Sequence, residues 1–213
     1  MNPDPIDEAV GWVRDGGLLA YPTETVWGLG ADSRSDSAVA RLNHWKGRDA
    51  SEPISILVAD TDCLVSLGFE LPPTAQRLAA TFWPGPLTLV LNCAGRFAPG
   101  VSRRDGAVGV RCSSHSLSVA IARRLAAAGV GPLTSTSLNR SGAPAAGHVE
   151  QARELCGSSD ESPRLVAVDG AEAGGEREST VIDATGAEPR VLRWGAVAQS
   201  ELTRCLRAFE KSA

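Results

Sequence analysis

The sequence predicts a single α/β domain whose twisted, mixed β-sheet is flanked by helices. Segments with a helical spacing of apolar residues alternate with short apolar runs typical of strands, and the loops between them are short. The chain has 213 residues and no internal repeat, which suits one domain of this class. We expect one domain over residues 1–213, with its core at about 8–197 and a C-terminal amphipathic helix at about 198–210.

Start and stop signals define each expected helix. Pro5 suits the first turn of a helix with Asp4 as its cap, and the pair Gly16-Gly17 ends that helix. Apolar residues at helical spacing mark the buried faces of the others. In chain order, the expected helices are 5–15, 36–46, 73–82, 117–128, 149–155 and 198–210.

Short apolar or β-branched runs between turn residues identify the strands. The stretch 20–32, "AYPTETVWGLGAD", is expected to be a loop after the first strand. Its threonines offer hydroxyl groups and its glycines let the backbone approach a ligand, so we expect this loop to hold one. In chain order, the expected strands are 18–21, 54–59, 87–91, 107–111, 133–136, 165–169, 180–183 and 190–193.

The composition argues against several classes of protein. A net charge of −4 disfavours a protein whose whole surface binds nucleic acid, although a local basic pocket is compatible with this charge. The five cysteines form no CxxC pair and the three histidines lack metal-ligand spacing, so no metal site is expected. We find neither a signal peptide nor an apolar run of about 18 residues, which predicts a cytoplasmic protein without a membrane span.

Standard phosphate-binding and nucleophile motifs are missing, but polar residues recur at the ends of the expected strands. GxxxxGK[ST] and GxSxG are absent, and Gly28 and Gly30 lack the third glycine of a dinucleotide fingerprint. Ligands of open α/β sheets bind in the crevice at strand ends. The polar residues at these ends are Thr23, Glu24, Thr25, Lys46, Arg48, Arg111, Ser135, Ser137, Asn139, Ser179 and Arg193.

These cations and hydroxyls indicate a polyanionic ligand with a small polar partner, because guanidinium forks match carboxylates and phosphates. Each feature alone also has a purely structural explanation. Lys46 and Arg48 could complement a helix C-terminus, and the run 135–141 could be turn chemistry. Arg111 and Arg193 could form surface ion pairs. The pattern by itself therefore predicts no more than an anion-binding α/β domain.

Seven blocks follow one another along residues 8–197: "YPTETVWGLGAD", "KGRDASEPISILV", "WPGPLTLVL", "VGVRCSSHSL", "LTSTSLNRSGAP", "STVID" and "VLRWG". In this order they resemble the YrdC/TsaC family, the L-threonylcarbamoyladenylate synthases. The resemblance implies a twisted sheet around a large, positively charged cavity, and the short bacterial type without a second domain. It also implies a reaction in which L-threonine, bicarbonate and ATP give threonylcarbamoyl-AMP and pyrophosphate for tRNA threonylcarbamoyladenosine modification.

The resemblance assigns roles to matching positions. Lys46 and Arg48 are the expected catalytic residues, over the ATP phosphates. The expected contacts of L-threonine are Thr25, Arg111, Ser135 and Ser179, with Arg111 on the carboxylate. The expected contacts of ATP are Lys46, Arg48, Ser137, Asn139 and Arg193.

The resemblance also implies the cofactor and the partners. Mg²⁺ is expected to arrive on ATP, because no carboxylate cluster is visible in the sequence. Transfer of phosphoryl and nucleotidyl groups relies mainly on positioning and charge neutralisation, so the implied reaction requires no nucleophilic side chain. The expected partners are the downstream threonylcarbamoyl-transfer proteins, and tRNA binding is expected to be weak at most.

Several residues depart from the family pattern. Trp27 stands where tyrosine is usual, Glu52 where lysine or asparagine is common, and Leu57 where some members have histidine. Leu138 replaces alanine inside SxN, where we expect it to add bulk against the nucleotide. These departures leave open a paralogue acting on another amine or carbamoyl donor. A non-catalytic RNA-binding module of the same fold is a further alternative. Separately, the stretch 170–178 is a candidate lid over the site, because it is charged and rich in glycine.

Overall fold

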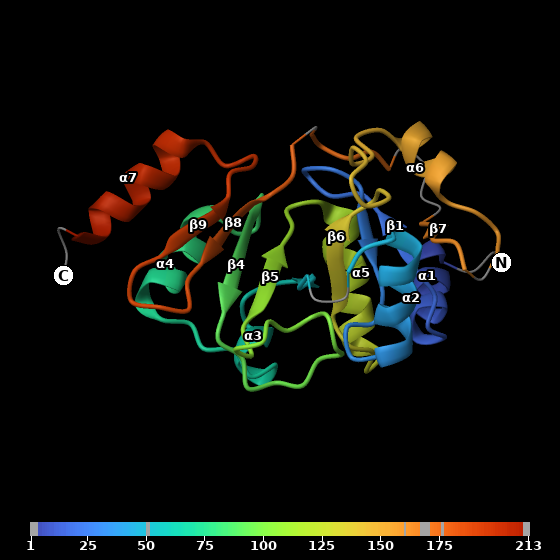
Figure 1. Cartoon of the computed structure of the whole chain (residues 1–213), viewed down its shortest axis with the longest axis horizontal. Coiled ribbons are helices and arrows are strands. Elements are labelled where there is room, and N and C mark those ends of the chain that lie inside the picture. The colour runs from blue at the N-terminus through green and yellow to red at the C-terminus, as the bar shows by residue number, and fades with distance from the viewer. Residues whose placement is uncertain (1–3, 50–51, 160, 167–170, 176, 211–213) are drawn as a thin grey trace.

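A mixed β-sheet runs along the length of the protein (Figure 1). The computed structural model describes residues 4–49, 52–159, 161–166, 171–175 and 177–210. Its strands are β1 (Leu19–Tyr21), β2 (Gly28–Gly30), β3 (Ser55–Val58), β4 (Leu87–Leu91), β5 (Val108–Cys112), β6 (Leu133–Ser137), β7 (Arg164–Leu165), β8 (Thr180–Asp183) and β9 (Arg190–Arg193). Within these residues the spatial order is β7-β1-β2-β6-β3-β5-β4-β8-β9.

The pairing of the central strands brings polar positions from distant segments together. β6 is antiparallel to both β2 and β3, β3 is parallel to β5, and β5 is antiparallel to β4. In this register Ser135 lies opposite Ser55, and Arg111 lies between Leu57 and Thr88. Directly paired residues point to the same face of a sheet, so these side chains share one face.

Local sequence signals set the ends of the helices. The Asp4 carboxylate accepts a hydrogen bond from the backbone N–H of Ile6 at 2.8 Å and caps the first helix. The second helix ends at Gly47, whose φ of 67° is the left-handed conformation that glycine adopts without strain. The helices are α1 (Pro5–Arg14), α2 (Asp36–Lys46), α3 (Cys63–Ser66), α4 (Pro73–Phe82), α5 (Ser116–Ala127), α6 (Val149–Leu155) and α7 (Gln199–Glu210).

The core consists of two apolar clusters, and alternating strand residues belong to one or the other. On β1, Leu19 and Tyr21 belong to the smaller cluster and Ala20 to the larger one. The smaller cluster includes Val13 of α1 and Ile121 of α5, and these two helices contact each other. This cluster occupies the sheet face that also carries the polar positions of β3, β5 and β6. The helices therefore cover only part of that face, and the rest carries a cavity.

The predicted fold class is confirmed, and the stretch 20–32 corrects one detail of the prediction. Gly28–Gly30 forms β2, a strand paired on both edges inside the sheet, where the sequence predicts a loop. Glycine has a low strand propensity, so the local sequence does not favour a strand here. Backbone pairing with β1 and β6 produces it. The short helix α3 is also absent from the prediction. Part of the predicted strand 165–169 lies outside the described residues.

Among the helices of the described residues, none is both long and apolar enough to cross a bilayer.

Candidate active site

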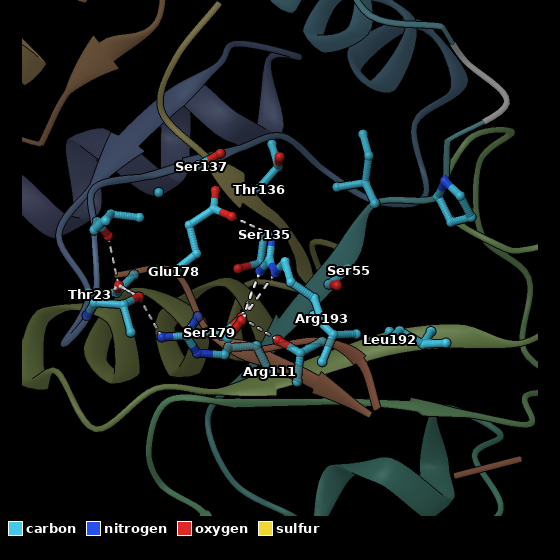
Figure 2. Close-up of a pocket in the computed structure, with 18 of the residues that line it drawn as sticks. Thr23, Ser55, Arg111, Ser135, Thr136, Ser137, Glu178, Ser179, Leu192 and Arg193 are labelled. Atoms are coloured by element: carbon cyan, nitrogen blue, oxygen red, sulfur yellow. Dashed lines mark hydrogen bonds and ion pairs between the residues drawn. The ribbon is translucent and has the colours of Figure 1, made fainter. Parts of the chain in front are cut away.

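A cavity of about 390 Å³ opens on the polar face of the sheet, a volume within the range of small-molecule sites. Its wall comes from the segments before β2 and β3, from β3, β4, β5 and β6, and from the start of β8 and the end of β9 (Figure 2). Most of the predicted site residues contribute to this wall, namely Thr25, Arg48, Arg111, Ser135, Ser137, Ser179 and Arg193. Lys46 and Asn139 lie behind it.

Arg111 on β5 is buried and joins the sheet to the segment before β2. Its Nη2 donates to Thr25 Oγ1 at 2.8 Å and to Glu24 Oε1 at 3.0 Å. Thr25 Oγ1 lies 2.8 Å from Thr23 Oγ1, so the two hydroxyls hold each other. Arg111 Nε is buried and has no hydrogen-bond partner among the described residues. The Arg111 guanidinium lines the cavity, and its planar fork suits an anionic group of a ligand.

Arg193 at the end of β9 reaches across to the residue before β8 (Figure 2). Its Nε and Nη2 donate to the Ser179 carbonyl oxygen at 3.2 and 3.0 Å, and Nη2 donates to Ser179 Oγ at 3.2 Å. Ser179 Oγ also lies 2.9 Å from Thr88 Oγ1. Arg193 Nη1 pairs with the Glu178 carboxylate at 2.5 Å. Gly195 is required here, because a Cβ at that position would lie 2.3 Å from the Glu178 carbonyl oxygen.

Lys46 supports the turn after β6 from behind the cavity wall. Its Nζ donates to the Ser137 carbonyl oxygen at 2.6 Å, to the Asn139 carbonyl oxygen at 3.1 Å and to Asn139 Oδ1 at 2.7 Å. Ser137 Oγ donates to the same Oδ1 at 2.9 Å. Burial, followed by the nearby charge of Arg48, lowers the pKa of Lys46 to about 8. Within this trio, Ser137 is the residue that faces the cavity.

Arg48 reaches the cavity from the turn that follows α2. Its side chain is 10% exposed, and burial lowers its pKa. Arg48 Nη2 donates to the Glu52 carbonyl oxygen at 2.6 Å and lies 3.3 Å from the Glu52 carboxylate. The Glu52 side chain is 68% exposed, so it places a negative charge at the edge of the cavity.

Sequence reasoning missed Arg103 and Thr88, which both line the cavity. Arg103 Nη1 donates to Asp183 Oδ2 at 2.7 Å, and hydrogen bonds to Asp105 and Asp183 raise the pKa of Arg103. Its place depends on this tertiary contact, which no motif spacing reveals. A signal for Thr88 was available, because it is a hydroxyl residue in the otherwise apolar predicted strand 87–91. In the structure it pairs directly with Arg111.

The residues that depart from the family pattern occupy different environments. Leu138 is fully buried in the larger apolar cluster, so the expectation that it adds bulk against a nucleotide is wrong. Leu57 packs in the smaller cluster near α1 and α5. Trp27 contributes to the cavity wall, and its buried Nε1 has no hydrogen-bond partner in the part of the chain that the structure describes.

Cys112 and Cys156 are unsuited to nucleophilic chemistry. All five are free thiols, and burial raises the pKa of Cys112 to about 11 and that of Cys156 to about 12. Among the residues that the structure describes, no group of three or more histidine, cysteine, aspartate or glutamate side chains is arranged to hold a metal ion. The arginines that line the cavity suit chemistry that depends on placing and neutralising charged substrates.

Fold and cavity together define a class: an α/β protein with a cavity on one face of a mixed sheet, lined by hydroxyl groups and arginines. Comparison with known proteins gives the family. The Sua5/YciO/YrdC family model, described as telomere recombination, matches residues 12–195. The chain belongs to this family.

Similar proteins include several named threonylcarbamoyl-AMP synthases. The chain is 38% identical to that of Chromohalobacter salexigens over 87% of this chain and 95% of the relative. It is 35% identical to the putative threonylcarbamoyl-AMP synthase of Mycobacterium tuberculosis, over 94% and 88% of the two chains. The crystal structure of Pyrococcus abyssi Sua5 complexed with L-threonine matches with a TM-score of 0.84 and 33% identity. That match covers 97% of this chain and 59% of the Pyrococcus chain.

Proposed function

We propose that this protein is an L-threonylcarbamoyladenylate synthase, which condenses L-threonine, bicarbonate and ATP into threonylcarbamoyl-AMP and pyrophosphate. One observation carries the proposal: the Arg111 guanidinium shares a cavity with those of Arg48 and Arg193. A carboxylate suits the first group and a triphosphate suits the other two. The names of the relatives and the threonine complex of the Pyrococcus protein support this assignment.

The amino-acid end of the cavity is proposed to lie at Arg111. Its guanidinium would hold the threonine carboxylate through charge-assisted hydrogen bonds. The hydroxyls of Thr25, Ser135 and Ser179 border the same region and would contact the amine and side-chain hydroxyl of threonine. The Thr88–Ser179 contact fixes one of these hydroxyls in advance.

The nucleotide end is proposed to lie at Arg48, Ser137 and Arg193, with Mg²⁺ entering as part of the ATP substrate. Arg48 and Arg193 would neutralise the charge of the phosphates. Lys46 and Asn139 would act through Ser137, whose position they fix, and the Lys46 ammonium would add positive charge behind it. Arg48 is therefore a stronger candidate than Lys46 for direct contact with the phosphates.

The proposed chemistry requires no protein nucleophile. The threonine amine attacks the carbon of bicarbonate, which loses hydroxide, or of CO₂ formed from bicarbonate by the same loss. The nitrogen loses a proton, so the products are a carbamate and one water molecule. A carbamate oxygen then attacks the α-phosphorus of ATP, a new P–O bond forms, and pyrophosphate leaves with the electrons of the broken bond. Placing the three substrates and neutralising the developing charge supply the rate enhancement.

Glu52 favours a second candidate, a paralogue with another amine or carbamoyl donor, because it adds negative charge where phosphates are expected.

In the main proposal, the chain works as one domain over residues 1–213 in the cytoplasm. Its product would pass to threonylcarbamoyl-transfer proteins that modify tRNA.

Pyrophosphate release from ATP by the purified protein tests the proposal. We expect release only when L-threonine and bicarbonate are both present. L-serine and L-valine in place of L-threonine serve as matched controls, since each lacks one feature of the threonine side chain. Release that continues without either co-substrate contradicts the proposal, and equal release with another amine supports the paralogue.

A further inference from the structure

Glu24 lies behind Arg111 and outside the cavity wall. Its Oε1 accepts a hydrogen bond from Arg111 Nη2 at 3.0 Å, and its Oε2 accepts one from Ser113 Oγ. The Glu24 side chain is 16% exposed, and the cavity lining does not include this residue. Both carboxylate oxygens are therefore engaged by the protein, so any effect of Glu24 on substrate passes through Arg111.

We propose that Glu24 is a positioning residue that orients the Arg111 guanidinium for the carboxylate of an amino-acid substrate, and that Gly174 holds Glu24 in place. The inference rests on the proposed function. Arg111 Nη2 is held by both Glu24 and Thr25, which fixes the plane of the guanidinium. Its Nε–H remains buried and unpaired among the described residues. A group that is oriented in advance loses less freedom on binding, so it binds its ligand more tightly.

Gly174 packs directly against the backbone of Glu24. Its N–H donates to the Thr23 carbonyl oxygen at 2.8 Å. A Cβ added at Gly174 would lie 3.0 Å from both Cα and the carbonyl oxygen of Glu24. A Cβ added at the next residue, Gly175, would come no closer than 3.4 Å to any atom, which is an ordinary contact. Neither glycine has a positive φ, so alanine strains neither backbone conformation and only Gly174 is restricted by packing.

The segment 171–175 is also tied to the start of α5. The Glu172 carbonyl oxygen lies 3.0 Å from His115 Nε2, and the backbone N–H of His115 donates to Ser113 Oγ at 3.1 Å. Ser113 is the residue that donates to Glu24. The segment, the start of α5 and Glu24 thus form one continuous set of contacts that ends at the arginine.

Four variants test the inference: Glu24→Ala, Glu24→Gln, Gly174→Ala and the matched control Gly175→Ala. We expect Glu24→Ala to raise the KM and the Kd for L-threonine about tenfold, equivalent to about 1.4 kcal/mol, and to change the KM for ATP little. Glu24→Gln keeps an oxygen for Arg111 and should recover part of this loss. Gly174→Ala should raise the threonine KM severalfold, and Gly175→Ala should match the wild type.

A measurement that needs no substrate separates this inference from the proposed function. Phenylglyoxal modifies arginine, and mass spectrometry of the Arg111 peptide reports its rate. We expect faster modification of Arg111 in Glu24→Ala and Gly174→Ala than in the wild type and Gly175→Ala. Equal rates in all proteins overturn the inference, as does an equal loss of threonine and ATP affinity in Glu24→Ala. Absence of threonine-dependent activity in the wild type overturns the proposed function instead.

Discussion

Lys46 Nζ lies 2.7 Å from Asn139 Oδ1, so the end of α2 is joined to the turn that follows β6. The same ammonium also donates to the carbonyl oxygens of Ser137 and Asn139. Two sequence blocks, KxR and SxN, are therefore one physical unit, with Ser137 facing the cavity and the other two behind it.

If Lys46 and Asn139 act as this unit, their substitutions are not additive. We expect Lys46→Ala and Asn139→Ala each to raise the KM for ATP about tenfold or more, because each removes a charge-assisted hydrogen bond. The double variant should be little worse than either single one. Steady-state kinetics on the four proteins gives the coupling free energy. Additive losses, such as those expected for Lys46 combined with the more distant Arg111, would speak against a shared role.

The lowered pKa of Lys46, about 8, predicts that ATP affinity falls as the pH rises through that value. The protonated form carries the charge that attracts phosphate, and its fraction drops above the pKa. Calorimetric titration with ATP in the absence of threonine avoids the titration of the substrate amine. Lys46→Ala should bind ATP more weakly and lose this pH dependence. An unchanged pH profile in Lys46→Ala would refute the assignment.

Glu52 is expected to weaken ATP binding, because its exposed carboxylate shares the edge of the cavity with Arg48. Glu52→Asn should lower the KM for ATP by about two- to fivefold, the effect of up to about 1 kcal/mol that exposed charges exert. Arg48 keeps its bond to the backbone carbonyl of residue 52, so its position survives the substitution. Glu52→Asp is the control and should resemble the wild type. A higher KM in Glu52→Asn would indicate that the carboxylate assists binding.

Arg111 and Arg48 are expected to separate the two substrates. Arg111→Ala should mainly raise the KM for L-threonine and Arg48→Ala the KM for ATP, each by the about 1.5–3 kcal/mol that charged hydrogen bonds contribute. Arg111→Lys keeps the charge but loses the planar fork, so it should recover little. Initial-rate measurements with each substrate varied give the comparison. Equal effects of both alanine variants on both substrates are incompatible with the two ends proposed for the cavity.

Asp183 is expected to contribute strongly to stability. Burial alone would raise its pKa, but hydrogen bonds from Thr185, Arg103 and Arg190 hold that pKa well below its usual range. Asp183→Asn should lower the free energy of unfolding by about 1.5–3 kcal/mol, the contribution of hydrogen bonds to a charged group. Asp105→Asn is the matched control, since Asp105 pairs with the same Arg103 but is half exposed, and it should cost about 1 kcal/mol or less.

The pH dependence of that difference has a definite sign. A carboxylate whose folded pKa is lowered stabilises the protein above its unfolded pKa, about 3.9, and this contribution is lost as the pH falls through the folded pKa. The gap in stability between wild type and Asp183→Asn should thus persist at neutral pH and shrink below about pH 4. Urea denaturation at several pH values measures it, and a gap that grows in acid would contradict the assignment.

Sequence patterns predicted the helices, the strands and the types of site residue better than the direction in which each side chain points. Most helices and strands, and the cavity positions of Arg111 and Ser179, follow from periodicity and motif. The strand at Gly28–Gly30 does not, because its pairing partners create it. The direction of Leu138 was also misjudged, although the alternation of an extended chain places it opposite its neighbours in SxN.

The contacts that fix Lys46, Arg103 and Glu24 were beyond sequence reasoning. Each depends on a residue far along the chain, such as Asn139 or Asp183. The spacing of residues in a single sequence does not show which residues far apart along the chain come into contact. Tertiary packing decides whether such a residue contacts a ligand or positions one that does.

The central claim is that L-threonine, bicarbonate and ATP meet in one cavity, and an isotope experiment tests it most directly. The protein is incubated with ATP, L-threonine and ¹³C-labelled bicarbonate, and the nucleotide product is examined by mass spectrometry. The account predicts an adenylate that contains both threonine and the ¹³C label, formed together with pyrophosphate and much reduced in Arg111→Ala at limiting L-threonine. Pyrophosphate release with an unlabelled nucleotide, or one that lacks threonine, would contradict it.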